Sequence, residues 1–577
     1  MGWSLYSEGR KRHTDGKEYW IHQDRAAREY AGVFYLRWKW EDLEPEEGKY
    51  AWECDSVFIN LIQGALDRNL RLAFRAFVHT GTPKYVLEKA ATYEHWGKQT
   101  PYADDEYFLE KYTKFIEAFG KKFNDPSIVD YIDSYGLGWW GEEHNIKYKD
   151  PDKKYETHDR IVKAYAKAFD KVINVVNFGV RDDRQKKVVY DELGFSPRRD
   201  GYASKWFTEA DQKALITYFP DKVIVSEACY WGDNDISYHI KQEGRKLWNT
   251  WAKYYEDVVN LALKTHANYL DMRTVAETRR YLEDAPAQAE KFLSDGGYRI
   301  LPVSISFSVE KGTLDVDHTW TNMGVGVLPN NNRNLGFKYK VAFALFDEEN
   351  NLVRKWLSEN IEVSELVNGK KINVSNAFDT SELESKKYKL AVAVINTREN
   401  DSKDITLAVE NAVKVKDEWI LVVSAFLHFP SFTTFYKPAT YKILLRETNP
   451  RRDKNGTKPQ ENKIKNASSP ASLVMDFSFL CKGTILSREK QTKSYKYIVN
   501  QPFIPYGHFQ EDTASASCTD LCCLFQRPVK IRFMPFVHYG IAADAHCLGT
   551  VYNPSAIICN AECVFHQQIG KKFHMAQ

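Results

Sequence analysis

Long apolar runs are missing from this chain. No stretch of about 18 apolar residues exists, so a membrane-spanning helix is not expected. The start, "MGWSLYSEGRKRHTDG", also lacks the apolar segment of a signal peptide, so the chain as written is not expected to be exported. Because strand-like residues begin at Gly2, we expect Met1 to be internal to a longer parent protein. An export signal and part of the first strand would then lie in the residues before Met1.

An excess of charge of one sign is missing too. The 80 lysines and arginines nearly balance the 78 aspartates and glutamates, which gives a formal charge of +2. Proteins that bind nucleic acid or anionic membranes carry basic blocks or stripes. Neither kind of partner is therefore expected here.

Cysteine is scarce until residue 480, where only Cys54 and Cys229 occur, and then becomes frequent. Residues 417–577 also hold 19 Lys or Arg against 12 Asp or Glu, and the last tryptophan is Trp419. Because these properties change together, residues 416–577 are predicted to be an atypical cysteine-containing tail, poorly ordered or not native to the rest. Its "CTDLCC" motif lacks paired CxxC spacing, so a zinc or disulfide module is a weaker alternative.

The first 295 residues alternate short β-rich runs with amphipathic helical runs, the pattern of a parallel sheet. Eight β/α units in this length predict a (β/α)8 TIM barrel. A doubly wound sheet is the alternative, but it usually has fewer strands, and no Gly-rich phosphate fingerprint follows the first one. The eight predicted strands are residues 2–6, 32–40, 70–78, 129–139, 172–180, 192–197, 222–231 and 267–273.

From residue 298 to 415 the pattern changes to alternating strands with turn residues between them, as in "KYKVAFALFDEENNLVRKWL". This pattern predicts an all-β sandwich. The expected organisation is therefore a barrel over 1–295, a sandwich over 298–415 and the tail over 416–577.

The stretch "YIDSYGLGWWGEEHN" runs from the predicted fourth strand into two glutamates. In a TIM barrel the active site lies at the carboxyl ends of the strands, so these glutamates are candidates by position. The three glycines of this stretch suit close backbone approach or room for a ligand. On an extended chain Glu142 and Glu143 would point to opposite sides, so only one should face the pocket.

A second carboxylate, Glu227 in "VIVSEACYW", ends the predicted seventh strand. Two carboxylates that meet across a barrel mouth suit glycoside hydrolysis, in which one protonates the leaving oxygen and the other attacks or activates water. Burial beside Trp139 and Trp140 would raise the pKa of the acid, and a nearby cation would keep the nucleophile ionised.

These residues resemble the clan A retaining glycoside hydrolases, TIM barrels whose acid/base and nucleophile glutamates end strands four and seven. The matching residues are Glu142 and Glu227. The segment "RWKWEDLEPEEGKYAW" (37–52) is similar to one that follows strand two in β-galactosidase-like members. "GLGWWGEEHN" and "DVDHTWTNMGVGVLPNNN" also resemble poorly characterised bacterial proteins in which a β-domain of unknown function follows the barrel. In that group the Gly-Glu-x-His pattern selects Glu142 over Glu143.

There is one departure from the resemblance. The clan places Asn, which binds the sugar 2-hydroxyl, directly before the acid/base, and here that position is Gly141. If Glu143 were the acid, Glu142 would occupy the Asn position. Both assignments stay open, with Glu142 preferred.

Further side chains are candidates for holding substrate or the two carboxylates. The resemblance implies that Arg37 hydrogen-bonds the nucleophile, with Arg75 as a competitor for that role. Tryptophans near the strand ends offer flat faces for sugar rings, although each also fits a core position. The substrate-binding candidates are Arg37, Trp40, Arg75, Trp140, Glu143, His144, Asn177 and Trp231.

The sequence thus predicts a retaining, β-galactosidase-like glycoside hydrolase that acts on oligosaccharides or polysaccharides and needs no metal or organic cofactor. Retention requires the two carboxyl groups to lie about 5–5.5 Å apart, against about 6.5–9.5 Å for inversion. The alternative is a catalytically inactive barrel that only binds carbohydrate. For a longer parent that works on polysaccharides, a secreted or periplasmic location is the expectation.

Overall fold

The computed structural model describes residues 1–422, apart from 96, 180, 233, 311, 385, 410 and 411, together with 427–428 and 441–444. Most of the predicted tail, including "CTDLCC", lies outside these described residues. The first residues after 415 do take part in the fold, because Trp419–Leu421 (β19) pairs with a strand of the second sheet. This sheet therefore continues past the predicted boundary at residue 415.

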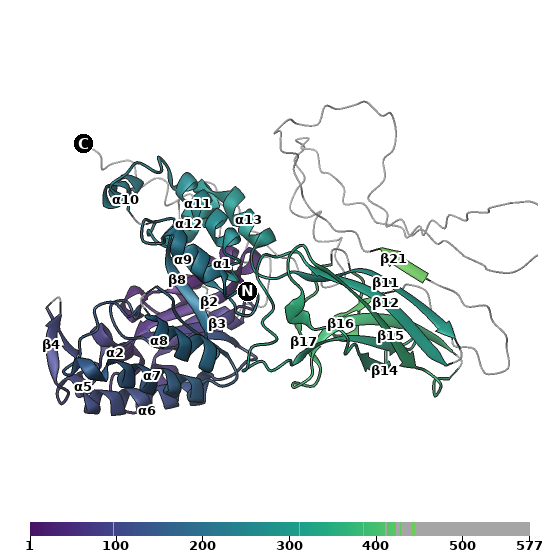
Figure 1. Ribbon diagram of the computed structural model, residues 1–577, viewed down its shortest axis with the longest axis horizontal. Coiled ribbons are helices and arrows are strands. Elements are labelled where there is room, and N and C mark those ends of the chain that lie inside the picture. Colours follow the sequence, from purple (N-terminus) through teal and green to yellow (C-terminus); the bar gives the residue numbers. More distant parts are fainter. Residues whose placement is uncertain are drawn as a thin grey trace, which may run out of the picture. The chain divides into compact units, whose positions relative to one another are not determined.

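Eight parallel strands form a closed barrel, as the β/α count predicted (Figure 1). The first strand pairs with both the second and the eighth, and this double pairing closes the barrel. In chain order the strands are β1 (Gly2–Ser7), β2 (Ala31–Lys39), β3 (Arg71–Phe77), β6 (Val129–Asp133), β7 (Ile173–Asn177), β8 (Ser196–Tyr202), β9 (Val225–Ala228) and β10 (Tyr269–Arg273).

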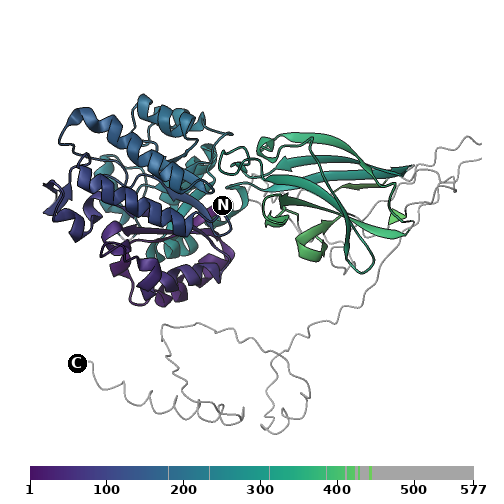
Figure 2. The same cartoon turned by 90° about the horizontal axis from the view of Figure 1, so that it is seen from below.

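Helices surround the strands of the barrel (Figure 2). Two of the long helices begin at side-chain caps. Asp105 accepts a hydrogen bond from the Phe108 amide before α6, and Thr250 accepts one from the Lys253 amide before α11. The longer helices are α1 (Lys17–Glu29), α4 (Ser56–Leu66), α6 (Glu106–Phe123), α7 (Lys154–Ala168), α9 (Glu209–Ile216), α10 (Ile236–Glu243), α11 (Trp251–Lys264), α12 (Val275–Asp284) and α13 (Pro286–Asp295).

Short elements fill several of the connections between strands and helices. A two-stranded sheet, β4 (Thr92–His95) with β5 (Lys98–Pro101), follows β3. Before β8 the chain forms a π-helical turn, η4 (Lys187–Glu192). Four short helices are α2 (Trp40–Leu43), α3 (Ala51–Cys54), α5 (Lys84–Leu87) and α8 (Asp183–Lys186).

Alternation along the strands sorts apolar from charged side chains. On β2, Phe34, Leu36 and Trp38 pack into the cluster shared with the helices, whereas Tyr35 belongs to a separate cluster that includes Tyr6, Tyr131 and Tyr269 of the other barrel strands. Arg37 is two residues beyond Tyr35 and therefore shares its inward face. The same period brings an ionisable side chain to the carboxyl end of most barrel strands.

Four tyrosines form a layer inside the barrel. Their ring centroids lie 5.0 Å apart for Tyr6 and Tyr35, 5.4 Å for Tyr35 and Tyr131, and 5.0 Å for Tyr131 and Tyr269, all with edge-to-face geometry. Several of these strands are not neighbours in the sheet, so the contacts cross the interior. Arg37 lies over the rings of Tyr6 and Tyr35. The tyrosine layer thus packs directly against the charged side chain of Arg37 inside the barrel.

Two strand predictions need correction. The fourth strand was predicted over 129–139 but ends at Asp133, because Gly136 and Gly138 have φ of 75° and 81° and leave the extended region. The sixth was predicted over 192–197, whereas β8 spans Ser196–Tyr202. Its polar sequence "SPRRDGY" resembles a loop, and residues 187–192 form the π-helical turn instead.

Antiparallel sheets follow the barrel, which confirms the predicted fold class. One sheet has the order β15-β12-β11-β21, and the other contains β14-β13-β16-β19-β18 with β17 and β20 paired to β16. Buried apolar residues such as Phe343, Leu390 and Trp320 fill their core. Strand bounds are β11 (Ile300–Glu310), β12 (Thr313–Asn322), β13 (Tyr339–Phe346), β14 (Leu352–Leu357), β15 (Lys371–Asp379), β16 (Lys387–Asn396), β17 (Ser402–Ile405), β18 (Lys414–Val415), β20 (Leu427–His428) and β21 (Tyr441–Leu444).

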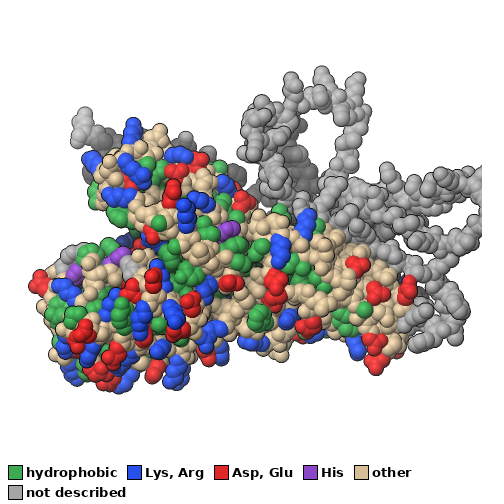
Figure 3. Space-filling model, viewed as in Figure 1, with side chains coloured by type: hydrophobic (Ala, Val, Ile, Leu, Met, Phe, Trp, Pro, Cys, Tyr) green, Lys and Arg blue, Asp and Glu red, His purple; other side chains and the backbone are tan. Residues whose placement is uncertain are grey.

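The described surface fits the balanced charge of the sequence. Acidic and basic side chains alternate over the face seen in Figure 3, without a basic stripe on that face. Among the described residues, none of the helices combines the length and apolar character that crossing a membrane requires.

Candidate active site

The carboxyl ends of the barrel strands converge on a set of buried charges above the tyrosine layer. Arginines come from β2, β3 and β8, and carboxylates come from β6, β9 and the segment after β6. Each has less than a tenth of its side chain exposed. We refer to this set as the charged layer; its members are Arg37, Arg75, Asp133, Glu142, Arg198 and Glu227.

Glu227, on β9, is held by two arginines. Arg37 Nη1 donates to Glu227 Oε1 at 2.8 Å, and Arg198 Nη2 contacts Glu227 Oε2. Burial by itself would raise the pKa of this carboxyl, but Arg37, Arg198, Arg273 and Arg75 outweigh burial and hold the pKa well below its usual range. Glu227 is therefore ionised at neutral pH.

Glu142 has a different environment. Arg198 Nη2 lies 2.7 Å and Arg75 Nη1 3.1 Å from its Oε1 atom, so both arginines contact the same oxygen. Burial, followed by the like charge of Asp200, raises the pKa of Glu142 to about 7, against the opposing pull of the two arginines. The two glutamates of the charged layer thus have pKa values on opposite sides of the ordinary glutamate value.

One atom connects the two carboxylates. Arg198 Nη2 contacts Glu142 Oε1 and also Glu227 Oε2. Two oxygens that contact the same nitrogen are separated by no more than twice a hydrogen-bond length, about 6 Å. Arg198 therefore fixes the two carboxylates close to one another across the barrel mouth.

A tight turn, rather than an extended chain, carries the two adjacent glutamates. The Trp139 amide donates to the His144 carbonyl at 3.0 Å and the Glu142 amide to the Trp139 carbonyl at 2.8 Å. Gly141 has φ of 71°, and a Cβ there would lie 3.2 Å from Arg75 Cδ. The position where the resemblance implies Asn thus favours glycine here, because of both the backbone and the nearby arginine.

Glu143 faces another partner. Its φ is 69°, so the prediction of extended neighbours pointing apart had the wrong backbone, although the side chains do separate. Glu143 pairs with Arg181, and burial raises its pKa to about 7. Glu142, and not Glu143, shares an arginine with Glu227.

Asn177 and His144 flank Glu142. Asn177, the last residue of β7, donates from Nδ2 to the Glu142 carbonyl at 2.9 Å and is 2% exposed. His144 Nε2 lies 4.0 Å from Glu142 Oε2, and burial lowers the pKa of its imidazole. Asn177 therefore holds the backbone of the Glu142 turn, and His144 is neutral near pH 7.

The three predicted tryptophans occupy different positions. Trp140 is 52% exposed next to His144, and Trp231 is partly buried with the Arg273 guanidinium 4.3 Å from its ring centroid. Trp40 is fully buried, donates from Nε1 to Glu44 at 2.8 Å and packs against Tyr112. Its predicted contact with substrate does not fit this position, because no face of the ring reaches solvent.

Sequence reasoning missed several charged neighbours of the carboxylates. Arg198 and Asp200 were missed because the sixth strand was placed too early, which left both in a supposed loop. Asp133 accepts hydrogen bonds from Arg75 Nε at 2.7 Å and from the Tyr35 hydroxyl at 3.0 Å. Period-two alternation from Tyr131 would have identified Asp133 as an inward residue.

One group of side chains has the composition of a metal site. Possible ligand atoms of Glu142, His144 and Asp200 all lie within 4.8 Å of one another. However, Arg198 contacts Glu142, and Arg199 Nη1 lies 2.5 Å from Asp200 Oδ1. The positive charge of these guanidinium groups would repel a metal ion at this place. The three side chains are therefore better suited to exchanging a proton than to binding a metal ion.

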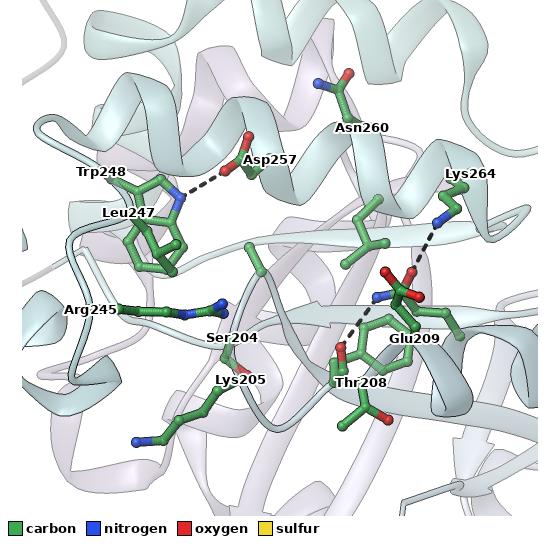
Figure 4. Close-up of a pocket in the computed structure, with 14 residues that line it drawn as sticks. Ser204, Lys205, Thr208, Glu209, Arg245, Leu247, Trp248, Asp257, Asn260 and Lys264 are labelled. Carbon is green, nitrogen blue, oxygen red and sulfur yellow. Dashed lines mark hydrogen bonds between the residues drawn. The ribbon is translucent and has the colours of Figure 1, made fainter.

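A cavity of about 570 Å³ lies elsewhere on the barrel, beside α11 and the segment after β8 (Figure 4). Trp248, whose Nε1 donates to Asp257 at 2.9 Å, forms part of its wall. Lys264 donates to Gln212 on another side. No member of the charged layer lines this cavity, so it is separate from the paired carboxylates.

No protein family and no curated protein matches the sequence. Among solved structures, the chain is similar to native xylanase 10B from Thermotoga maritima, with 12% identity over 47% of this chain and 82% of that one and a TM-score of 0.32. It is also similar to endo-glycoceramidase II from Rhodococcus sp., with 11% identity over 65% of this chain and 97% of that one and a TM-score of 0.33. A third similar structure is a β-galactosidase from the psychrophilic Marinomonas ef1, with 9% identity over 51% of this chain and 62% of that one and a TM-score of 0.32.

Proposed function

We propose that the barrel is a retaining glycoside hydrolase, with Glu142 as the acid/base and Glu227 as the nucleophile. The observation that carries the proposal is the contact of Arg198 Nη2 with both carboxylates. The upper limit of about 6 Å that it sets on their nearest oxygens favours the short separation used for retention over the 6.5–9.5 Å used for inversion.

The split in pKa values supports these two roles. A carboxyl whose pKa is about 7 still carries its proton in much of the neutral range and donates it to a leaving oxygen. Glu227, ionised because arginines surround it, attacks the anomeric carbon. Glu143 has an equally raised pKa but pairs with Arg181 and does not share an arginine with Glu227, so the acid is assigned to Glu142.

The reaction proceeds in two balanced steps. Glu227 forms a bond to the anomeric carbon while the glycosidic bond breaks and the leaving oxygen takes the proton of Glu142. Esterified Glu227 then has no charge, which removes one of the causes that raise the pKa of Glu142. Glu142 can accordingly accept a proton from water, whose oxygen replaces Glu227 at the anomeric carbon.

The substrate is a glycan, with β-galactosides as the first candidates because of the resemblance of residues 37–52. Trp140 offers a half-exposed ring on the turn that carries Glu142, and Trp231 lies close to the barrel mouth beside Arg273. Aromatic rings of this kind provide flat apolar faces for sugar rings.

A second candidate function is carbohydrate binding without turnover. One observation favours it: the Arg198 guanidinium touches both carboxylates, in the region where the sugar of a hydrolase substrate would react. A bound sugar must take the place of at least one of these contacts. If Arg198 does not give way, the carboxylates never reach an anomeric carbon.

The two functions are separated by assaying the full chain on aryl β-galactoside, β-glucoside, β-mannoside and α-arabinoside, beside Glu142→Ala and Glu227→Ala. A hydrolase should turn over at least one substrate and lose most of that rate in both variants. Azide should rescue Glu227→Ala with a glycosyl azide of inverted configuration, and Glu142→Ala with one of retained configuration.

Glu143→Ala is the matched control, because it removes the adjacent buried glutamate. If Glu143→Ala, and not Glu142→Ala, gives the azide of retained configuration, the acid/base assignment is wrong. If the folded chain hydrolyses none of the four glycosides but binds glycans, the second candidate function replaces the first.

A further inference from the structure

Glu142 has further close neighbours besides the two arginines. Its Oε1 atom is taken by Arg75 and Arg198, whereas Asp200 and His144 approach the carboxyl group to within 4.8 Å. The proposed mechanism gives Asp200 no role. A second carboxylate so close to a catalytic one calls for an explanation, because like charges at this distance repel strongly.

The geometry of β8 places Asp200 at this point. Arg198 and Asp200 are two residues apart, so they share one face of the strand. The register between β8 and β9 shifts between Arg199 and Tyr202, and Gly201 has φ of 76°. A single short segment therefore supplies both the cation and the anion that contact Glu142.

Asp200 is held in place by its own neighbour. Arg199 Nη1 lies 2.5 Å from Asp200 Oδ1 and donates to the Asp200 carbonyl at 2.9 Å. Arg199 Nη2 is in turn fixed by the Trp206 carbonyl at 2.6 Å. The Asp200 carboxylate is thus fixed by a side chain that does not contact Glu142.

The charges around this pair decide which carboxyl keeps a proton. Glu142 faces Arg75 from β3, Arg198 and Asp200 from β8, Glu227 from β9 and neutral His144 from its own turn. For Asp200, burial raises the pKa, but Arg199, Arg198 and a hydrogen bond from Glu142 outweigh it and lower the pKa. Two close carboxyls with such unequal environments hold one proton, and that proton is on Glu142.

We propose that Asp200 is a positioning residue for Glu142: ionised Asp200 accepts a hydrogen bond from the protonated Glu142 carboxyl and keeps the proton there until the leaving oxygen takes it. The inference rests on the proposed function for its catalytic meaning, but the shared proton itself does not. It adds Asp200 to the carboxylates of the site.

The test follows the ionisation of Glu142 directly. Protein labelled with 13C at the glutamate carboxyls is titrated by NMR in the presence of EDTA, and Glu142→Gln identifies the Glu142 resonance. Asp200→Asn should lower the midpoint of Glu142 by about one pH unit, because the repelling charge is gone. Asp200→Glu keeps the charge and should keep the midpoint high.

Asp211→Asn is the matched control, since Asp211 lies 3.9 Å from Arg199 Nη2 and is not among the groups that act on Glu142. It should leave the Glu142 midpoint unchanged. If Asp200→Asn fails to fold, Asp200→Ser makes the same removal of charge. A Glu142 midpoint that stays the same or rises when the charge of Asp200 is removed overturns the proposal.

Activity provides a second, separate readout. With an active wild type, the basic limb of the kcat/KM profile should move to lower pH in Asp200→Asn and return in Asp200→Glu. If no glycoside is hydrolysed while the NMR midpoint still falls, the shared proton stands and the proposed function fails. If hydrolysis is observed but neither midpoint nor limb moves, the proposed function stands and the role of Asp200 fails.

Discussion

Arg37 Nη1 donates a hydrogen bond to Glu227 Oε1 at 2.8 Å, although 190 positions separate the two residues in sequence. Strand β2 brings the arginine and β9 the glutamate to the same end of the barrel. The same guanidinium lies 2.9 Å from Glu8 through Nε. Arg37 is therefore the cation on which the ionised state of Glu227 most depends.

Replacing this cation should change the acidic limb of the pH profile. Because Arg37 lowers the pKa of Glu227, Arg37→Met should raise that pKa and move the acidic limb of kcat/KM to higher pH. Arg71→Met is the control, since Arg71 pairs with Asp130 at the other end of the strands. Both variants should lose stability, but an acidic limb that moves equally in both would contradict this role for Arg37.

The basic limb of the wild-type profile should report Glu142. Its pKa is raised to about 7, and the acid must be protonated for the first step, so kcat/KM should fall as pH rises through about 7. In Glu142→Gln the rate should drop by about 10²–10⁴-fold and the basic limb should disappear. If the basic limb persists in Glu142→Gln, it reports the ionisation of another group, and Glu143 is the first to test.

Glycine should be needed at position 141 both for its backbone conformation and because any side chain there would meet Arg75. Gly141→Ala and Gly48→Ala both place alanine at positive φ, 71° and 75°, so each should lose about 1–2 kcal/mol of unfolding free energy. Only at Gly141 does the new Cβ meet Arg75, since nothing lies within 4 Å of it at Gly48. Activity, measured as kcat/KM, should therefore fall in Gly141→Ala alone, whereas denaturant unfolding should show a similar loss of stability in both variants. Equal activity losses would refute the contact argument.

Asn177 should matter for turnover more than for folding. Asn177→Ala removes the hydrogen bond to the Glu142 carbonyl, and Asn174→Ala on the same strand removes bonds to Phe169 and Ser134 instead. Both should lose about 1–3 kcal/mol of stability as buried partners are left unpaired. We expect kcat to drop only for Asn177→Ala, and a similar drop in both would mean that the loss is one of stability.

Two of the three tryptophans predicted from sequence, Trp140 and Trp40, should differ in their effects on substrate binding and on stability. Trp140→Ala removes a ring that is 52% exposed, so it should raise KM for an oligosaccharide and leave the unfolding free energy almost unchanged. Trp40→Ala removes a fully buried ring and should lose about 3–5 kcal/mol. An unchanged KM in Trp140→Ala across all glycans that the chain hydrolyses would exclude its ring as a sugar platform.

The barrel could be predicted from sequence because its strands are short apolar runs separated by well-capped helices. The segment 32–40 carries a strong pattern, and β2 begins and ends within one residue of it. β8 could not be placed in the same way. Its inward residues are arginine and aspartate, so the buried strand reads as a polar loop.

In the candidate site, Glu227 was predictable because a charge directly followed a short apolar strand, whereas Arg37 was implied by the resemblance. Glu142 was found from the pattern around it, although the strand ends at Asp133 and a turn of positive-φ residues carries the glutamate. The pairing of Arg37 with Glu227 was expected from the resemblance, but Arg198, which contacts both glutamates, was not. Arg198 joins Glu142 to Glu227 only through the curvature of the closed barrel.

Strand β8 supplies Arg198 and Asp200 from the same face, two positions apart. A deletion of one residue in the π-helical turn before it, if it shifted β8 by one position, would place Arg199 where Arg198 now stands and Gly201 where Asp200 stands, so the carboxylate that faces Glu142 would be lost. A change in the length of this connection therefore alters both positions at once. For evolution, as for protein engineering, the length of that turn is as constrained as the identity of any side chain in the charged layer.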